Sequence, residues 1–465
     1  MACRLTSFRL AALLPVLLAF SAVHLAAQSA DDKAFQQAMS AMQAGQFAQA
    51  RTLLTQLRAR HAHDFPVDES LGLACAQLGD LKSALSSLLA ATQDDPSSAV
   101  AEANLGTAYL KLHQNLPAIH ALEASARLDP SNASTQVALG QAYMLVHQPA
   151  KAASAFHVAL QQSDLQKNDT APSLLYNAAL ADYQSGHAAQ AEPLLQRMPG
   201  VEDSAEAQSL YGDVDESLGK FEDAARHYAS AANLDPSEGN VFLLGIEFLR
   251  HWTFDPAIKE FEAGVKRYPA STRMQLGLGV AYYGGSYYDK AIPIFATLLR
   301  KNPDNALYAE LLGRDCTVLT EGIRPECAAL VGFAERHPRN AVIATYAATS
   351  ILHQPKGQQQ LDTARTLLTH ALRAEPRMPD AQFAMALLMQ QENQWKQSIP
   401  LLEQAIASKP DYATAHYRLA LAYNHDGDRQ KAQQQIALEL KYSKADRAEV
   451  ENRLRSVTTF LVKMQ

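Results

Sequence analysis

One feature constrains this chain more than any other: a helical pattern breaks off and resumes at intervals of about 34 residues. In its cleanest copy, residues 272–305, apolar residues recur at helical spacing around Gly279, stop at 284–286, and recur around Phe295 until Pro303. Two apolar faces separated by a break predict a helix–turn–helix hairpin. Neither helix could bury its apolar face alone, so each hairpin needs neighbours, which the repetition supplies.

The same small and aromatic residues return in phase along the chain. A Leu-Gly-x-x-Tyr element on the first helix precedes an Ala-x-x-x-Phe element on the second, as in Leu105, Gly106, Tyr109, Ala118 and Leu122, then Leu139, Gly140, Tyr143, Ala152 and Phe156, then Leu244, Gly245, Phe248, Ala257 and Phe261. The small residues let two helices approach closely, and the aromatic residues fill the space between layers. In these elements and their spacing the chain resembles the tetratricopeptide repeat (TPR) family.

The resemblance implies an all-α fold: an α-solenoid of about twelve TPR-like hairpins that forms a right-handed superhelix with a long concave groove. A charged helix over residues 442–465 is expected to cap the array, because a solenoid needs a terminal unit with a polar outer face. The expected repeat array covers residues 28–441, with units near 31–64, 65–98, 99–132, 133–166, 172–204, 205–238, 239–271, 272–305, 306–338, 339–378, 379–412 and 413–441.

The first residues differ from the rest. Arg4 and Arg9 precede and flank an apolar run over residues 10–20, and small residues before Gln28 suit cleavage. This pattern is typical of a signal peptide over residues 1–27, because the apolar run is too short to span a bilayer. We therefore expect an exported protein, periplasmic or secreted. The alternative is an uncleaved anchor.

Composition and motifs argue against several classes of protein. The formal net charge is −7, and loss of Arg4 and Arg9 would lower it to −9, which opposes nucleic-acid binding. No apolar run long enough for a transmembrane helix follows the first thirty residues. No phosphate loop, zinc-protease motif or nucleophile elbow stands in the sequence, so we expect a non-enzymatic protein without cofactor or metal. Asp213, Asp215 and Glu216 lack an evident basic companion, and we interpret them as a solvated acidic wall.

Two cysteines of the ninth unit form a candidate disulfide. Cys316 takes the aromatic position of the first helix and Cys327 lies near the start of the second helix. These positions face each other in an antiparallel pair, and an oxidising compartment would allow a bridge. The alternative is two independent buried cysteines. Cys75 is expected to be an inert core residue.

The concave groove is the predicted binding site, since the resemblance implies that ligand contacts come from the first helix of each unit. Mapping this register onto the fifth to ninth units gives a mixed wall of aromatic, aliphatic and charged residues, which suits a protein or peptide ligand. The candidates are Tyr176, Tyr183, Asp213, Glu216, Phe242, Ile246, Arg250, Arg273, Tyr283, Glu310 and Arg314.

The sequence therefore predicts an exported scaffold that binds a protein or peptide, by analogy with envelope assembly, secretion, or pilus and polysaccharide export. One alternative is a saccharide-binding or enzymatic module, in which Tyr282, Tyr283, Tyr287 and Tyr288 stack on a sugar; it fails if Tyr282 and Tyr288 belong to the repeat core. Another is a structural homo-oligomer. The partner and the oligomeric state stay open.

Overall fold

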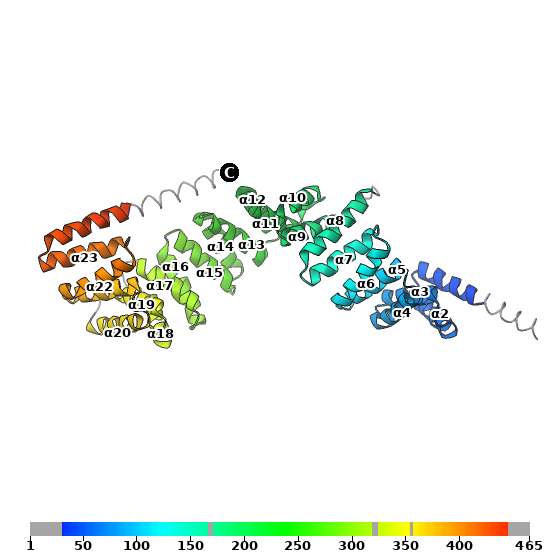
Figure 1. Cartoon of the computed structure of the whole chain (residues 1–465), viewed down its shortest axis with the longest axis horizontal. Helices are drawn as coiled ribbons and strands as arrows, with labels where there is room; N and C mark the ends of the chain where they lie inside the picture. Colours follow the sequence, from blue (N-terminus) through cyan, green and yellow to red (C-terminus); the bar gives the residue numbers. More distant parts are fainter. Residues whose placement is uncertain (1–29, 166–170, 319–323, 354–356, 445–465) are drawn as a thin grey trace, which may run out of the picture. The chain divides into compact units, whose positions relative to one another are not determined.

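The computed structural model describes residues 30–165, 171–318, 324–353 and 357–444. The chain divides into two compact units, Met1–Val201 and Glu202–Gln465, which are described separately. Every element in the described ranges is helical (Figure 1). The predicted signal peptide and residues 445–465 of the predicted cap lie outside these ranges. No helix within them is long and apolar enough to cross a membrane.

The first unit is a series of helical hairpins. Residues 30–43 are helical and precede α2, and successive pairs follow, with the 3-10 turn η1 at the end of the unit. The helices are α2 (Phe47–Arg60), α3 (Phe65–Gln77), α4 (Leu81–Asp94), α5 (Ala99–Lys111), α6 (Asn115–Leu128), α7 (Ala133–Leu145), α8 (Pro149–Leu165), α9 (Pro172–Gln184), α10 (Ala188–Arg197) and η1 (Val201–Asp203).

The second unit repeats this organisation, so the predicted all-α solenoid of TPR-like hairpins is confirmed. Its helices are α11 (Ala205–Ser217), α12 (Phe221–Leu234), α13 (Glu238–Arg250), α14 (Phe254–Arg267), α15 (Thr272–Gly284), α16 (Tyr288–Lys301), α17 (Ala306–Val318), η2 (Pro325–Ala328), α18 (Ala329–Arg336), α19 (Ala341–Leu352), α20 (Gln358–Ala374), α21 (Pro379–Gln391), α22 (Trp395–Ser408) and α23 (Ala413–Asp426). Residues 429–444 are also helical.

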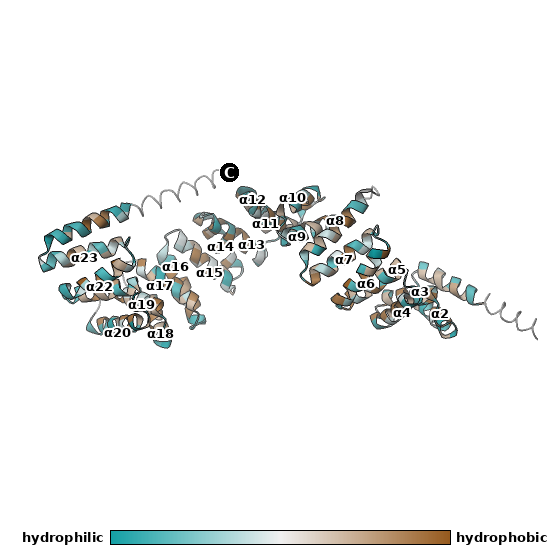
Figure 2. Ribbon diagram, viewed as in Figure 1, coloured by the Kyte–Doolittle hydropathy of each residue, from teal (hydrophilic) through white to brown (hydrophobic). Residues whose placement is uncertain are grey.

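Small residues on the first helix receive aromatic rings from the second. A Cβ on Gly245 of α13 would lie 2.6 Å from Cζ of Phe261 on α14, which is itself fully buried. Gly279 receives Phe295 in the same way one hairpin later. The helices accordingly carry both apolar and polar residues, brown and teal in Figure 2. This contact is the physical basis of the repeated Gly and Phe in the sequence.

The turn inside the cleanest repeat differs from the expected break at 284–286. Helix α15 continues through Gly284, and the left-handed backbone falls on Ser286, with φ of 66°. The two glycines instead leave room for aromatic rings, since a Cβ on Gly284 would overlap the ring of Phe254 and one on Gly285 would crowd Tyr287. Close approach, rather than backbone freedom, explains this pair of glycines.

Candidate functional site

Side chains on the first helices of the second unit contact one another from hairpin to hairpin. We call this surface the helix-A face of the second unit. It is defined by the predicted groove residues of α11, α13, α15 and α17: Asp213, Glu216, Phe242, Ile246, Arg250, Arg273, Tyr283, Glu310 and Arg314.

Arg273 joins α15 to α13. Its Nε donates to Oε1 of Glu238 at 2.5 Å, and its guanidinium carbon lies 5.1 Å from the ring centre of Phe242. The Ser271 hydroxyl donates to the same carboxylate oxygen at 2.6 Å. Hydrogen bonds from Ser271 and then Arg273 lower the pKa of Glu238. The guanidinium thus lies over an aromatic ring while nearly half of the Arg273 side chain stays exposed.

Arg314 lies beyond the middle of α17, directly after Gly313. Its Nη2 donates to Oε1 of Glu310 at 2.6 Å, one helical turn earlier. The Tyr346 hydroxyl of α19 and the Tyr283 side chain of α15 both interact with this guanidinium. Tyr283 also makes an edge contact with Tyr288, with 5.7 Å between ring centres. One arginine and two tyrosines, Tyr283 and Tyr346, therefore meet on three successive first helices.

An ionic cluster occupies the other end of the face. Nη1 of Arg250 lies 2.8 Å from Oε2 of Glu247 and 3.2 Å from Oε1 of Glu216. The ring nitrogen Nε2 of His251 lies 3.1 Å from Oε1 of Glu247 and 3.3 Å from Oε2 of Glu216. Each carboxylate therefore presents one oxygen to the guanidinium and the other to the imidazole.

The environment of Glu247 favours its neutral form. Its side chain is fully buried, and burial followed by the neighbouring Glu216 carboxylate raises the pKa of Glu247 to about 8. Arg250 opposes this shift without cancelling it. Two carboxylates this close repel each other, so either one carboxyl group keeps its proton or a cation lies between them.

The expectation of a solvated acidic wall at Asp213, Asp215 and Glu216 is wrong. Tyr228 donates its hydroxyl to Oδ1 of Asp213 at 2.7 Å, and Asp215 is buried. Burial raises the pKa of Asp213, although the Tyr228 hydrogen bond and Arg250 oppose that shift. Glu216 pairs with Arg250 and His251 of the following hairpin, and Asp215 lies 3.5 Å from Nε2 of His227 on α12; sequence spacing within one helix reveals neither contact.

Glu247 and His251 are the residues that sequence reasoning missed. They are four residues apart, at the end of α13, and therefore share one side of the helix. Glu247 stands two residues after Gly245, a position that holds alanine after Gly72, Gly106 and Gly279. A carboxylate at a position that otherwise packs in the core was the sequence signal that could have identified Glu247 as a functional residue.

Two predicted residues lie in the first unit. Tyr176 and Tyr183 stand on α9, both half-buried, and no site between the two units is described. Ile246 is half-buried against the core of the second unit. The structure thus brings Glu216 together with Arg250, and Tyr283 together with Arg314, but it does not join the α9 tyrosines to them.

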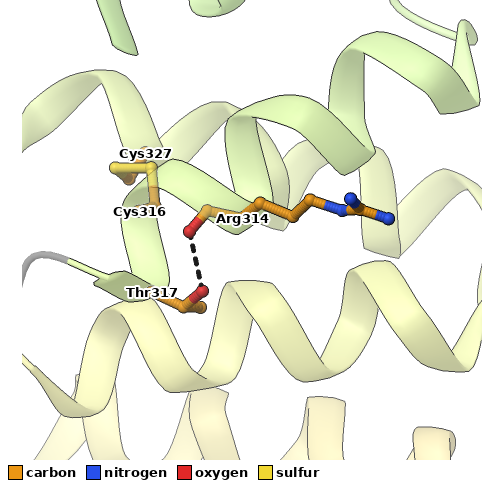
Figure 3. Close-up of a disulfide and its surroundings, with 4 residues drawn as sticks. All are labelled: Arg314, Cys316, Thr317 and Cys327. Atoms are coloured by element: carbon orange, nitrogen blue, oxygen red, sulfur yellow. Dashed lines mark hydrogen bonds between the residues drawn. A yellow bond between two sulfur atoms is a disulfide. The ribbon is translucent and has the colours of Figure 1, made fainter. Parts of the chain in front are cut away.

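The ninth hairpin carries a disulfide between Cys316 of α17 and Cys327 of η2, with 6.0 Å between their Cα atoms. Figure 3 shows this bond, and the Arg314 side chain extends away from it. The Thr317 hydroxyl donates to the Arg314 carbonyl at 2.9 Å in the same view. Cys75 is a free, buried cysteine.

The tyrosine cluster proposed for sugar stacking is divided by the structure. Tyr282 belongs to the core, with 8% of its surface exposed, and its hydroxyl contacts Glu262. Tyr287 is 40% exposed, and its hydroxyl lies 3.3 Å from Oδ1 of Asp255. Because Tyr282 faces the interior, the saccharide alternative loses one of its four aromatic residues.

Comparison with known proteins addresses the repeats. Solved structures with detectable likeness include YrrB, described as a TPR protein with an unusual peptide-binding site (17% identity, TM-score 0.36, 40% of this chain and 95% of that chain). The Cut9–Hcn1 hetero-tetramer of the APC/C gives 14% identity and a TM-score of 0.36, over 92% of this chain and 96% of that chain. PilF of Pseudomonas aeruginosa gives 19% identity and a TM-score of 0.35, over 45% and 95%.

No curated protein sequence matches this chain. A family model described as tetratricopeptide repeat matches residues 35–99, 242–306 and 383–447. The middle match covers α15 with its Gly279, and extends over much of α13, which carries Phe242, Ile246 and Arg250. The tetratricopeptide repeat model thus matches one stretch of the first unit and two stretches of the second unit.

Proposed function

We propose that the helix-A face of the second unit binds a protein or peptide segment and that the chain acts as a non-enzymatic scaffold. One observation carries this proposal: Arg250, Arg273 and Arg314 are each held by carboxylates, yet their side chains stay 47%, 48% and 49% exposed. A guanidinium held in this way loses little freedom when it donates its remaining N–H groups to a ligand.

Apolar side chains lie among these arginines. Phe242, Ile246 and Tyr283 are half-buried on the same first helices and offer contact area beside the charges. Aromatic residues and arginine are the usual anchors of protein interfaces. The combination suits a segment that presents carboxylates or backbone carbonyls next to apolar side chains. TPR repeats in general mediate protein–protein interaction, which supports the same assignment.

A random peptide library displayed on phage tests this proposal against the full chain. A variant with Phe242, Ile246 and Tyr283 changed to Ala should lose the enriched peptides while its helicity, measured by circular dichroism, is retained. The matched control changes Leu116 and Leu234, which are 62% and 45% exposed on the second helices α6 and α12. Equal enrichment on the wild type and on the face variant would overturn the assignment.

We further propose that the protein is exported and works in an envelope or extracellular assembly such as secretion, pilus formation or polysaccharide export. The N-terminal charged and apolar pattern and the Cys316–Cys327 bridge both support an oxidising compartment outside the cytoplasm. N-terminal sequencing of the protein recovered from fractionated cells should begin at Gln28. Recovery of Met1 in the cytoplasmic fraction would contradict export.

A further inference from the structure

The ionic cluster of α11 and α13 has the donor arrangement of a metal centre. Glu216, Glu247 and His251 each offer one ligand atom, and these three atoms lie within 4.8 Å of one another. Nε2 of His251 is 3.1 Å from Oε1 of Glu247 and 3.3 Å from Oε2 of Glu216. We propose that these three residues bind a divalent transition-metal ion of the zinc class.

The distances fit tetrahedral coordination. Zinc–nitrogen and zinc–oxygen bonds are about 2.0–2.2 Å, so adjacent ligand atoms around a tetrahedral ion lie roughly 3.3–3.5 Å apart. Both distances from the His251 nitrogen are already close to this value. Glu216, whose side chain is 21% exposed, is the least buried of the three ligands and has the most room to adjust toward the ion.

The buried oxygen of Glu247 provides an independent indication. Glu247 is fully buried, and no well-oriented hydrogen bond reaches its Oε1, although Nε2 of His251 lies 3.1 Å away. A buried carboxylate oxygen in this state requires a proton or a cation nearby.

Arg250 would support the ion from outside. Its Nη1 contacts Oε2 of Glu247 and Oε1 of Glu216, the oxygens opposite those that face His251. Hydrogen bonds of this kind orient metal-binding carboxylates in known sites. The guanidinium and the ion would therefore occupy opposite sides of the two carboxylates and need not compete for the same oxygens.

The donor set selects the class of ion. One imidazole and two carboxylates suit zinc and neighbouring transition metals, whereas calcium takes six to eight oxygen ligands and magnesium prefers octahedral oxygen coordination. With three protein ligands, a fourth position is left for water or a ligand atom. The rival description is a closed ionic network, in which protonated His251 and Arg250 neutralise both glutamates without a metal.

The site would connect two consecutive hairpins. Glu216 belongs to the hairpin of α11 and α12, whereas Glu247 and His251 belong to that of α13 and α14. An ion held by both would stabilise their relative position at the helix-A face. This inference is independent of peptide binding, because the metal is measured on the chain alone.

Chelator-treated full-length chain should be titrated with ZnCl2 by calorimetry and with CoCl2 by visible absorption, which reports tetrahedral coordination. The wild type should bind one equivalent of the metal ion. Glu216→Gln and His251→Gln should bind the ion at least 10-fold more weakly. His157→Gln is the matched control, because His157 contacts a single buried carboxylate, that of Asp182, at 2.9 Å in the first unit. The His157→Gln variant should bind one equivalent of metal with the affinity of the wild type.

Folding is checked by the melting temperature of each metal-free variant. Zinc should raise the melting temperature of wild type and of His157→Gln, but not that of Glu216→Gln or His251→Gln. If wild type binds no stoichiometric equivalent, or if all four proteins bind it with the same affinity, the cluster is a closed ionic network and the metal site is overturned.

Discussion

Glu247 and Asp315 occupy the same register of α13 and α17, each two residues after the glycine of its first helix, Gly245 or Gly313. Both carboxyl groups are fully buried. In the other hairpins that carry this glycine, the residue two positions after it is alanine or valine, as at Ala281 after Gly279. Two hairpins of the second unit therefore bury an acidic group at a position that normally serves close helix packing, and each group needs its own physical account.

Asp315 should make the protein less stable as the pH rises. Neither carboxylate oxygen has a hydrogen-bond partner, and burial raises the pKa of Asp315 to about 8. Between about pH 4 and pH 8 the folded state thus holds a proton that the unfolded state releases, so stability falls with rising pH, by up to about 1.4 kcal/mol per pH unit. Asp315→Asn should reduce this slope in urea titrations, and the slope that is left is the contribution of Glu247, whose pKa is likewise raised to about 8.

The control for this prediction is Glu335→Gln, which changes an exposed carboxyl group on α18 and should keep the wild-type slope. The Asp315 variant should be more stable than wild type at pH 8.5 and similar to it near pH 4. A wild-type slope in Asp315→Asn would show that another group causes the pH dependence. Tyr283 is a titratable neighbour of Asp315. Burial, with a smaller contribution from the Asp315 carboxylate, raises the pKa of Tyr283.

Gly245→Ala should destabilise the second unit. The new Cβ would lie 2.6 Å from the buried ring of Phe261, which cannot move without opening the core. Overpacking of this kind costs about 1–3 kcal/mol. Gly332→Ala on α18 is the matched control, since its nearest neighbour is the flexible end of Arg336 at 3.5 Å, and it should stabilise by about 0.5–1 kcal/mol. Equal effects in thermal denaturation would contradict the packing account.

The repeated fold could be predicted from sequence because its contacts are local. Gly245 and Phe261 are 16 residues apart, and every hairpin with this pair repeats the same spacing. Helix termini also follow local sequence rules, because the side chains of Ser271 and Asn340 cap helices by accepting hydrogen bonds from the amides of Met274 and Ile343. Local rules of this kind need no knowledge of the tertiary arrangement.

The ionic cluster could not be predicted in the same way. Glu216 and Glu247 lie 31 residues apart, on different hairpins, so their meeting depends on how consecutive first helices pack. Glu247 occupies a core register, and a helical pattern assigns such a position to packing rather than to chemistry. That the groove residues bind a ligand remains a prediction, because the structure shows contacts among these residues and contains no ligand.

Reduction of the Cys316–Cys327 bridge should loosen one hairpin. The bridge spans 11 residues, and in the chain-entropy model a loop of this length contributes about 3 kcal/mol. Hydrogen exchange of the α18 amides should therefore accelerate on addition of dithiothreitol, and α15 amides should change little. A variant with both cysteines changed to Ala should exchange like the reduced protein. Cys75→Ala should retain the response to reductant, and its loss there would refute the assignment.

Arg58→Leu should destabilise the first unit by leaving a buried carboxylate without its counter-charge. Arg58 Nε lies 2.7 Å from Oδ1 of Asp68, which is 2% exposed, and Nη1 of Arg58 donates to the Ser87 hydroxyl at 3.1 Å. Breaking a buried pair costs about 3–5 kcal/mol. Because Arg58 is itself one-third exposed, we expect about 2–3 kcal/mol in urea denaturation.

Two features distinguish this loss from a simple loss of packing. Burial raises the pKa of Asp68 and Arg58 opposes that rise, so without the arginine the folded state should favour the neutral carboxyl group even more strongly. The deficit of Arg58→Leu should then shrink as the pH falls, and Asp68→Asn in the same chain should restore most of the stability at pH 7. Arg51→Leu, which removes from α2 an exposed contact of 3.9 Å with Asp80, should leave the stability close to that of the wild type. A deficit in Arg58→Leu that depends neither on pH nor on Asp68 would mean that the arginine stem, and not its charge, stabilises α2 against α3.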